Sequence, residues 1–449
     1  SMHAPAGGSP ASAAAGSGGS AGNGNAGASA TTPIAGNGSA GVTAAAGSGA
    51  GGMSSTGAAP NTAPGFMDLT PPLADPLDGK GNPVRPAAPS GWTWYQIDGA
   101  ICRDGSPTGF YVRSGSADKL LIYLEGGGAC SSPGFCSYNP ASADEVLSGD
   151  GQTLLGSAGG ATSGRQQPGG KGIFDTSRSE NPFKDWHQVY IPYCTGDVHF
   201  GTRKDVTVTG VSKPQQFVGH LNLQKFIGHL VPTYKSKLSR VVLTGASAGG
   251  FGAALNYSMV QDAFGSVLVT VLDDSGPAFS DNPRYMPVCM QKSWRELWGY
   301  DAAFPPDCSE CRQADGGGFG ELNKFVFRKH PNATLGVVSS MQDEVIRMFY
   351  SSGLQNCRSF TTADPTSITL GQLDPSVYMP GADYTAGLNE SRMKGVSTGK
   401  FASYYLGGAN ITYHQHIWRD RFYDASAGKL SIAQWTSNLL AGKLEQVGP

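Results

Sequence analysis

The chain has 449 residues, a net charge of −2 at neutral pH and only 15% charged residues. This composition offers no basic stripe with which to bind nucleic acid, and no apolar run reaches the roughly 18 residues that a membrane span requires. We therefore expect no nucleic-acid partner and no membrane span, and we expect the protein to be a monomer.

The amino-terminal segment comes first in the chain, and its composition predicts no fold. Residues 1–65 contain no Asp, Glu, Lys or Arg and consist mostly of Gly, Ala, Ser, Thr, Asn and Pro. Such a segment buries too little apolar surface to offset the entropy of ordering it, so we predict a disordered linker. A neutral tether of this kind suggests export and attachment to the cell surface, behind a signal segment or lipid anchor. Residues 66–449 are predicted to be the folded domain.

Apolar runs alternate with helical patterns through that domain. The runs that predict buried strands are 92–97, 119–124, 187–193, 240–244, 267–272, 334–340 and 401–406, of which 401–406 is the last. The apolar spacing predicts helices at 217–230, 249–261 and 432–440. Continuously apolar strands between helices predict an α/β fold, with a mostly parallel central sheet and helices on both faces. Residues 285–330, rich in Trp, Pro and Cys, are predicted to be a lid-like insertion.

Eight cysteines all lie in the predicted domain: Cys102, Cys130, Cys136, Cys194, Cys289, Cys308, Cys311 and Cys357. An even number agrees with four disulfides and an oxidising compartment. Cys130 and Cys136 could close a short local loop, and Cys102 and Cys194 could join the amino-terminal strands. The Cys308-x-x-Cys311 pair could also indicate redox or zinc chemistry, but it lies in a Pro- and Asp-rich loop without a second such pair. That context favours structural disulfides.

A Gly-x-Ser-x-Gly pentapeptide stands where the predicted strand 240–244 gives way to a helix. Residues 243–250 read Leu-Thr-Gly-Ala-Ser-Ala-Gly-Gly. A serine between strand and helix can be held on a tight turn that exposes its hydroxyl, and the glycines relieve the crowding around it. Ser247 is therefore the candidate nucleophile. The same pentapeptide also occurs by chance, as a glycine-rich loop that carries no chemistry.

A serine hydroxyl needs an imidazole to take its proton and a carboxylate to hold that imidazole. In folds with this turn the chain order is Ser, then Asp or Glu, then His. Of eight histidines, only His414 and His416 follow both Ser247 and a suitable acid. Residues two apart in an extended segment project to the same side, so both remain candidates for the base. A metal-binding His-x-His pair lacks a third ligand at suitable spacing.

Three aspartates compete for the role of the acid. Asp343 directly follows the predicted strand 334–340, where the acid is expected. Asp273 and Asp274 follow the strand next to that of Ser247, and could instead anchor loops around Ser275-Gly276. We predict Asp343.

Acyl transfer also needs donors for the oxygen that becomes negative. The amide of Ala248, directly after the nucleophile, is one candidate. The loop Glu125-Gly126-Gly127-Gly128 follows the strong strand 119–124, and its glycines let amides approach a substrate closely. Gly127 and Gly128 are therefore candidate oxyanion residues. The alternatives are a flexible turn or a phosphate cradle, the latter weakened because no Lys completes a Walker pattern.

With these residues assembled, the chain resembles the pectin acetylesterase and Notum family of α/β-hydrolase-like serine esterases. The segments that carry the resemblance are Leu124–Cys130, Gly245–Gly250, Asp274–Gly276 and Gln342–Glu344. The resemblance implies an α/β-hydrolase-like fold and removal of an ester-linked acyl group by a Ser-Asp-His triad, without metal or cofactor. It assigns Ser247 as the nucleophile and Asp343 as the acid.

For the base, the family pattern has a short polar residue, then apolar ones, and an aromatic pair beyond. His414, followed by Gln415 and Ile417 with Phe422-Tyr423 further on, fits this pattern better than His416. The doublet departs from the single histidine of the family. A second departure is Gly128-Ala129, where members often carry an aromatic residue; it opens space above the oxyanion donors.

These observations predict a secreted serine carboxylic-ester hydrolase that removes acetyl groups from a polysaccharide such as pectin. The alternatives are an esterase on a lipidated protein, a small ester or a polyester, or a catalytically silent carbohydrate-binding homologue. An intact set of Ser, Asp and His argues against a homologue without catalytic activity. Four aromatic residues could line a substrate groove or simply pack within the lid: Trp294, Trp298, Tyr300 and Phe304.

Overall fold

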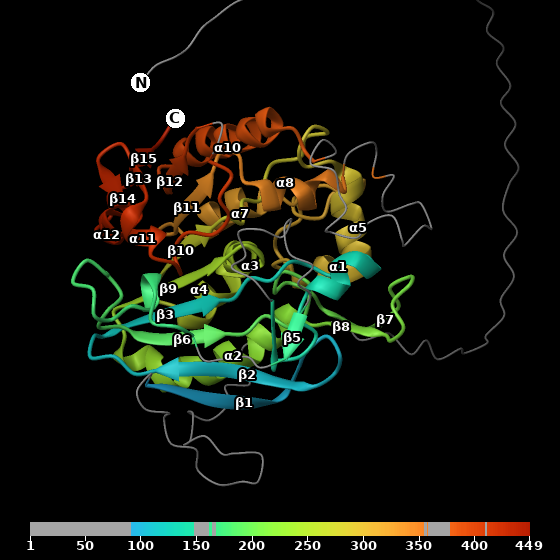
Figure 1. Cartoon of the computed structure of the whole chain (residues 1–449), viewed down its shortest axis with the longest axis horizontal. Helices are drawn as coiled ribbons and strands as arrows, with labels where there is room; N and C mark the ends of the chain where they lie inside the picture. Colours follow the sequence, from blue (N-terminus) through green and yellow to red (C-terminus); the bar gives the residue numbers. More distant parts are fainter. Residues whose placement is uncertain (1–90, 148–160, 164–167, 354–356, 358–377, 409–410) are drawn as a thin grey trace, which may run out of the picture. The chain divides into compact units, whose positions relative to one another are not determined.

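A mostly parallel sheet carries the fold (Figure 1). The computed structural model describes residues 91–147, 161–163, 168–353, 357, 378–408 and 411–449. These residues all belong to the unit Asn61–Pro449. The predicted linker, residues 1–65, lies outside the described residues.

The sheet has nine strands, which in spatial order are β1 (Trp92–Ile101), β2 (Pro107–Arg113), β6 (His187–Ile191), β3 (Lys119–Leu124), β9 (Arg240–Ala246), β10 (Leu268–Asp274), β11 (Thr334–Ser340), β12 (Phe401–Leu406) and β15 (Gln446–Val447). Only the pairs β1–β2 and β2–β6 are antiparallel. From β6 to β15 every neighbouring pair is parallel. The carboxyl ends of the central strands therefore meet at one edge, which is where functional residues gather in such sheets.

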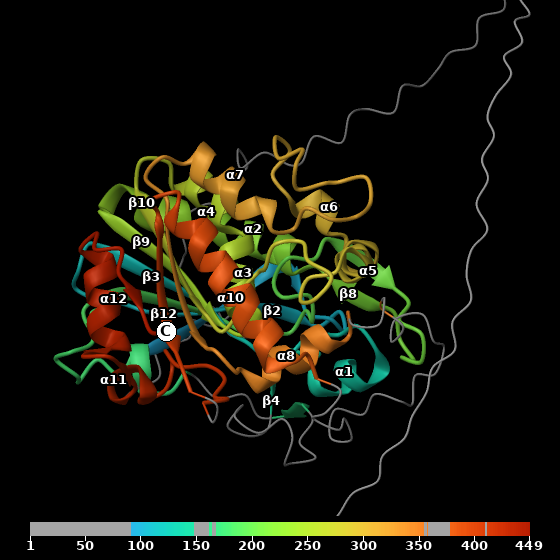
Figure 2. The same cartoon turned by 90° about the horizontal axis from the view of Figure 1, so that it is seen from above.

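Helices cover both faces of this sheet, as the apolar strands predict. Along β3, Leu120, Ile122 and Leu124 belong to one hydrophobic core, whereas Leu121 and Tyr123 belong to the other. The first core is completed by the helices α2 (Gly219–Tyr234), α4 (Tyr257–Phe264), α7 (Glu321–Lys329) and α10 (Gly381–Val396). The second is completed by α11 (Arg421–Asp424), α12 (Ile432–Leu440) and the 3₁₀ turn η1 (Gly172–Phe174). In Figure 2, α11 and α12 lie together, apart from α4, α7 and α10.

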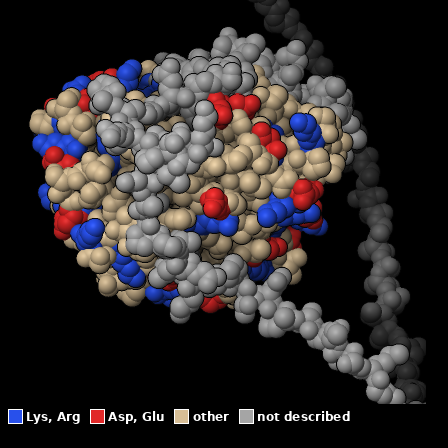
Figure 3. Space-filling model, turned by 90° about the horizontal axis from the view of Figure 1, so that it is seen from below, with Lys and Arg blue, Asp and Glu red and all other residues tan. Residues whose placement is uncertain are grey.

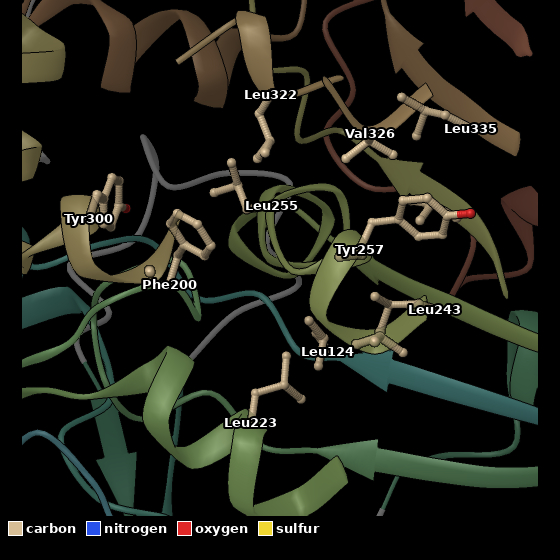
Figure 4. Close-up of a cluster of buried hydrophobic side chains, with 14 of the residues drawn as sticks. Leu124, Phe200, Leu223, Leu243, Leu255, Tyr257, Tyr300, Leu322, Val326 and Leu335 are labelled. Atoms are coloured by element: carbon tan, nitrogen blue, oxygen red, sulfur yellow. The ribbon is translucent and has the colours of Figure 1, made fainter. Parts of the chain in front are cut away.

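The first core extends directly beneath the edge that carries the site. Figure 4 shows Leu124 of β3, Leu243 of β9, Leu223 of α2 and Leu255 of α3 (Ala248–Leu255) pointing toward one another. All four side chains are almost fully buried. Burial of a leucine side chain contributes about 1.5–3 kcal/mol, so this packing fixes the end of β9 against its neighbours.

Several sequence expectations agree with the structure to the residue. Strands 119–124, 334–340 and 401–406 and helix 432–440 have the predicted ends. The last of these, α12, begins with a capping box in which Ser431 and Gln434 exchange hydrogen bonds.

Three expectations need correction. Residues 401–406 are not the last strand, because β13 (Ser426–Ala427), β14 (Leu430–Ser431) and β15 follow; two-residue strands carry no readable period. Strand β2 was not anticipated. The helix expected at 249–261 is broken into α3 and α4 at Asn256, whose side chain donates to the carbonyl oxygens of Gly252 and His199.

The remaining elements are short or lie between the main strands. They are α1 (Pro133–Tyr138), β4 (Glu145–Leu147), β5 (Ala161–Ser163), β7 (Arg203–Val206), β8 (Gln215–Phe217), η2 (Lys235–Lys237), α5 (Val288–Trp298), α6 (Tyr300–Ala303) and α8 (Glu344–Ser351). Residues 285–330, inserted between β10 and β11, form the helices α5, α6 and α7. The lid role of this segment stays a prediction.

All eight cysteines form disulfides: Cys102–Cys194, Cys130–Cys136, Cys289–Cys357 and Cys308–Cys311. The first two are the pairs suggested by the sequence, and the last supports the structural interpretation of the Cys-x-x-Cys pair. Cys289–Cys357 joins α5 to the segment beyond the carboxyl end of α8. Four disulfides are typical of proteins in oxidising compartments.

The surface agrees with the near-neutral composition. On the face shown in Figure 3, acidic and basic residues are interspersed over the described surface, without a basic stripe. Among the helices that the structure describes, none combines the length and the apolar character needed to cross a membrane.

Candidate active site

Ser247 occupies a strained turn between β9 and α3. Its φ is 59° and its ψ is −123°, a conformation that a non-glycine residue rarely adopts, and only 4% of its surface is exposed. Its amide donates to the carbonyl oxygen of Asp274 at 2.8 Å, which fastens the turn to the end of β10. Backbone strain of this kind, held by the surrounding structure, is typical of catalytic serines on an α/β sheet.

The two flanking glycines are required by close packing. A Cβ at Gly245 would lie 2.4 Å from the backbone of Gly249, and one at Gly249 would lie 1.9 Å from the carbonyl oxygen of Leu124. Side-chain carbons do not tolerate such distances, so any larger residue would displace the turn. The Gly-x-Ser-x-Gly pattern therefore follows from the contact between the turn and β3.

Asp343 and His414 form a buried pair. Asp343 caps α8, where its Oδ1 accepts from the amide of Ile346 at 3.0 Å. Its Oδ2 accepts from Nδ1 of His414 at 2.8 Å, and both side chains are nearly inaccessible to solvent. A carboxylate that binds Nδ1 fixes the orientation of the imidazole and leaves Nε2 as the other ring nitrogen.

His416 lies in a different environment. Its ring is fully buried, with Nε2 3.3 Å from Oγ of Ser340. Burial, reinforced by the positive charge of Arg421, lowers the pKa of His416 well below its ordinary value, so the ring is neutral. Between the two histidines, Gln415 has a φ of 64°, which turns the chain. The segment is therefore not extended, so the spacing argument that both rings project to one side does not apply to it.

The neutral state of His416 gives a prediction for acid stability. Because its folded-state pKa lies below its unfolded value, the group contributes stability above pH 6.5 that is lost as the pH falls. We expect the wild-type protein to lose more unfolding free energy than His416→Gln between about pH 6.5 and pH 5. Denaturant unfolding at these two pH values measures the difference. An equal loss in both proteins would show that His416 does not titrate in this way.

Asp274 and Ser275 hold the histidine segment in place. Oδ2 of Asp274 accepts from the amides of His416 at 2.6 Å and Ile417 at 2.9 Å. Oγ of Ser275 accepts from the amide of Gln415 at 3.1 Å. Burial raises the pKa of Asp274 to about 6. The geometry is that of a loop anchor, the alternative role considered for the pair Asp273 and Asp274.

Asp273 has a local role as well. Its Oδ1 accepts from the amide of Gly276 at 2.9 Å, and burial raises its pKa well above the ordinary value. Of the three candidate acids, Asp343 is the one hydrogen-bonded to a histidine ring.

The glycine loop after β3 packs against the serine turn. A Cβ at Gly126 would lie 2.4 Å from the carbonyl oxygen of Ala246 and 3.0 Å from Cβ of Ser247. Gly127 and Gly128 have φ values of 152° and 79°, which glycine adopts readily and other residues do not. Gly128 and Ala248 border the same pocket as Ser247. Gly128 and Ala248 thus share a pocket with Ser247, whereas a Cβ on Gly127 would meet Tyr193 and Pro140.

That pocket holds about 620 Å³ of space, part of it open to solvent. Its walls are almost entirely apolar, and the aromatic residues among them are Phe135, Phe251, Trp294, Trp298, Tyr300, Phe319, Phe349 and Tyr350. Trp294, Trp298 and Tyr300 come from the predicted aromatic set, whereas Phe304 is buried against Phe200 and Phe319. Phe349 and Tyr350 of α8 were not anticipated, because amphipathic spacing does not tell a pocket wall from a core.

Comparison with solved structures identifies the fold. Two crystal structures of the Drosophila Wnt deacylase Notum are similar, each with a TM-score of 0.52, at 19% and 20% sequence identity. The first match covers 78% of this chain and 94% of that one. This likeness shows an α/β-hydrolase-like fold, in which Ser247 stands at the carboxyl end of β9.

Sequence comparison points to one family. Residues 93–315 match the family model described as Pectinacetylesterase. The curated relatives include a Drosophila melanogaster palmitoleoyl-protein carboxylesterase NOTUM, 28% identical over 46% of this chain and 31% of its own length. They also include Pectin acetylesterase 5 of Arabidopsis thaliana, 30% identical over 36% of each chain. These matches relate the chain to the pectin acetylesterase and Notum family.

These matches cover only part of the chain and of its relatives, so they bear on only some of the candidate site residues. The aligned region spans about a third of the length of the curated relatives. The family match includes Ser247 and the glycine loop, but it ends before Asp343 and His414. The roles of these two residues therefore depend on the geometry alone. Within the described ranges, no cluster of His, Cys, Asp and Glu side chains has the arrangement of a metal site.

Proposed function

We propose that the protein hydrolyses carboxylic esters through a triad of Ser247, His414 and Asp343. The observation that carries this proposal is the buried hydrogen bond between Asp343 and Nδ1 of His414, combined with the strained turn at Ser247. Asp343 holds the imidazole so that Nε2 accepts the proton of the serine hydroxyl as it attacks the ester carbonyl. The same nitrogen then protonates the leaving alcohol.

The carbonyl oxygen becomes negative in this step and needs fixed donors. The amides of Gly128 and Ala248, two residues that border the same pocket as Ser247, are the proposed donors, together with Gly127 of the same loop. The acyl-enzyme on Ser247 is then hydrolysed by water that His414 deprotonates, which releases the carboxylic acid. Each oxyanion donor of this kind contributes about 10²- to 10³-fold in rate.

The proposed substrate is an acetylated polysaccharide such as pectin, outside the cell. Support comes from the pectinacetylesterase family match and from the Arabidopsis relative that is named a pectin acetylesterase. Four disulfides support secretion. The composition of residues 1–65 supports a tether at the cell surface.

A second candidate is an ester with a longer acyl chain, including one on a lipidated protein. The pocket beside Ser247 favours it, because its aromatic and aliphatic walls offer more apolar surface than an acetyl group can cover. Several curated relatives are named palmitoleoyl-protein carboxylesterases.

One panel of substrates tests the proposal and separates the two candidates. We expect the protein to hydrolyse p-nitrophenyl acetate, and Ser247→Ala to reduce this activity by about 10⁴-fold or more. Release of acetate from acetylated pectin or xylan, with little turnover of esters beyond butyrate, would identify the polysaccharide substrate. A kcat/KM that rises with chain length would identify the second candidate. If Ser247→Ala retains the activity, the proposed triad is wrong.

A further inference from the structure

A buried arginine lies behind the glycine loop. Arg103 is 5% exposed and lies two residues after the end of β1. Its Nε donates to Oδ1 of Asn139 at 3.1 Å, and its Nη2 donates to the carbonyl oxygens of Cys136 at 2.9 Å and Asn139 at 2.6 Å. A fourth contact joins Nη1 to the side chain of Gln215. The guanidinium thus holds both the side chain and the backbone of Asn139 in one position.

These contacts determine which way the amide of Asn139 points. A guanidinium can only donate, so the atom that faces Nε must be the oxygen Oδ1. The nitrogen Nδ2 is therefore directed the other way, where it donates to the carbonyl oxygen of Gly127 at 3.0 Å. Asn139 is 1% exposed, so water does not compete for either bond.

The bond to Gly127 acts on a peptide unit that reaches the pocket. The carbonyl group of Gly127 and the amide of Gly128 belong to one planar trans peptide, so they point in opposite directions. A Cβ on Gly127 would meet Tyr193 and Pro140, on the side of Asn139. A Cβ on Gly128 would meet Phe349, which lines the pocket with Ser247. With its oxygen held by Asn139, this peptide directs the amide of Gly128 away from Asn139.

We propose that Asn139, fixed by Arg103, is a positioning residue that aims the amide of Gly128 at the developing oxyanion. This inference rests on the proposed function, since it concerns the same site. Both glycines have positive φ values, so the chain alone does not restrict this peptide strongly. An oxyanion donor is effective only when it is held in place before the reaction, and the hydrogen bond from Asn139 supplies that restraint.

The substitution Asn139→Asp tests this role. A carboxylate still accepts from Arg103, but it cannot donate to the carbonyl oxygen of Gly127. We expect kcat for p-nitrophenyl acetate to fall by about 10- to 100-fold, less than for a donor that is removed outright, while KM changes by less than about threefold. The rate of Ser247 phosphonylation by a p-nitrophenyl phosphonate should fall by the same factor, with unchanged final stoichiometry.

The matched control is Asn222→Asp. Asn222 of α2 is also buried, accepts from the amide of Ile101 and donates to its carbonyl oxygen at 2.7 Å, and neither bond involves the glycine loop. It should lower the melting temperature but leave kcat within about twofold. If Asn139→Asp does not fold, Asn139→Ser makes the same test, because its hydroxyl is too short to reach Gly127.

The outcomes are distinguishable. If Asn139→Asp keeps the wild-type kcat, the positioning role is wrong. It is also wrong if kcat falls in proportion to the melting temperature to the same extent in Asn139→Asp and Asn222→Asp. Failure of the phosphonate to label Ser247 in the wild-type protein would instead overturn the proposed function.

Discussion

Replacement of His414 by alanine should lower kcat/KM by about 10⁴- to 10⁶-fold, the loss that follows removal of a triad member. In the proposed triad the imidazole paired with Asp343 takes the proton of Ser247, and no other histidine ring is hydrogen-bonded to that carboxylate in the described part of the chain. Labelling of Ser247 by a p-nitrophenyl phosphonate, followed by intact mass spectrometry, measures the loss as a rate of covalent modification.

His416→Gln is the matched control for this experiment. It alters a fully buried neutral ring that contacts Ser340, so it should reduce stability but keep kcat/KM within about tenfold. The two substituted residues lie two positions apart in one short segment, so the comparison separates the roles of the two rings. Fast labelling in His414→Ala together with slow labelling in His416→Gln would assign the base to His416.

Asp274→Ala should cause the largest loss of stability among the site variants. The carboxylate accepts from the amides of His416 and Ile417 and from the hydroxyl of Ser275, all buried. Each buried donor that loses its partner costs about 1–3 kcal/mol, so we expect a decrease of about 3 kcal/mol or more in unfolding free energy. Because the same bonds hold the segment of His414, kcat should fall even where the variant is folded. Denaturant unfolding and kcat measured at the same temperature check both effects.

Asp273→Asn serves as the control for that variant. Asp273 accepts from the amide of Gly276 and from none of the three donors that bind Asp274. Burial raises the pKa of Asp273, which favours the uncharged carboxyl group that asparagine resembles. Its cost should be about 1 kcal/mol or less. A loss in Asp273→Asn as large as in Asp274→Ala would show that general packing at the end of β10, rather than anchoring of the histidine segment, sets the stability.

Much of the fold could be predicted because its strands bury both faces. The run Lys119–Leu124 is apolar at nearly every position, and the structure places alternate residues in two separate cores. Strand β2 was missed because its sequence, Pro-Thr-Gly-Phe-Tyr-Val-Arg, mixes buried and exposed positions and contains no long continuous apolar run. The break at Asn256 depends on a hydrogen bond to His199, more than fifty residues away in the chain, and local spacing carries no information on such contacts.

Some residues of the candidate site could likewise be predicted from the sequence, and others could not. Ser247, Asp343 and the pair of histidines could be identified from motif, strand ends and chain order. The difference between His414 and His416 could not, because it depends on the left-handed conformation of Gln415, which a sequence pattern does not indicate. Asn139 gave no signal at all. Its importance depends on two long-range contacts, to Arg103 and to Gly127.

The disulfide Cys289–Cys357 has a consequence for how the protein is handled. It joins α5, which contributes Trp294 and Trp298 to the pocket, to Cys357, which follows α8, the helix that contributes Phe349 and Tyr350. The disulfide therefore links two parts of the pocket lining. In a reducing buffer these parts are held by packing alone, so under the proposed function the range of accepted esters depends on the thiol state.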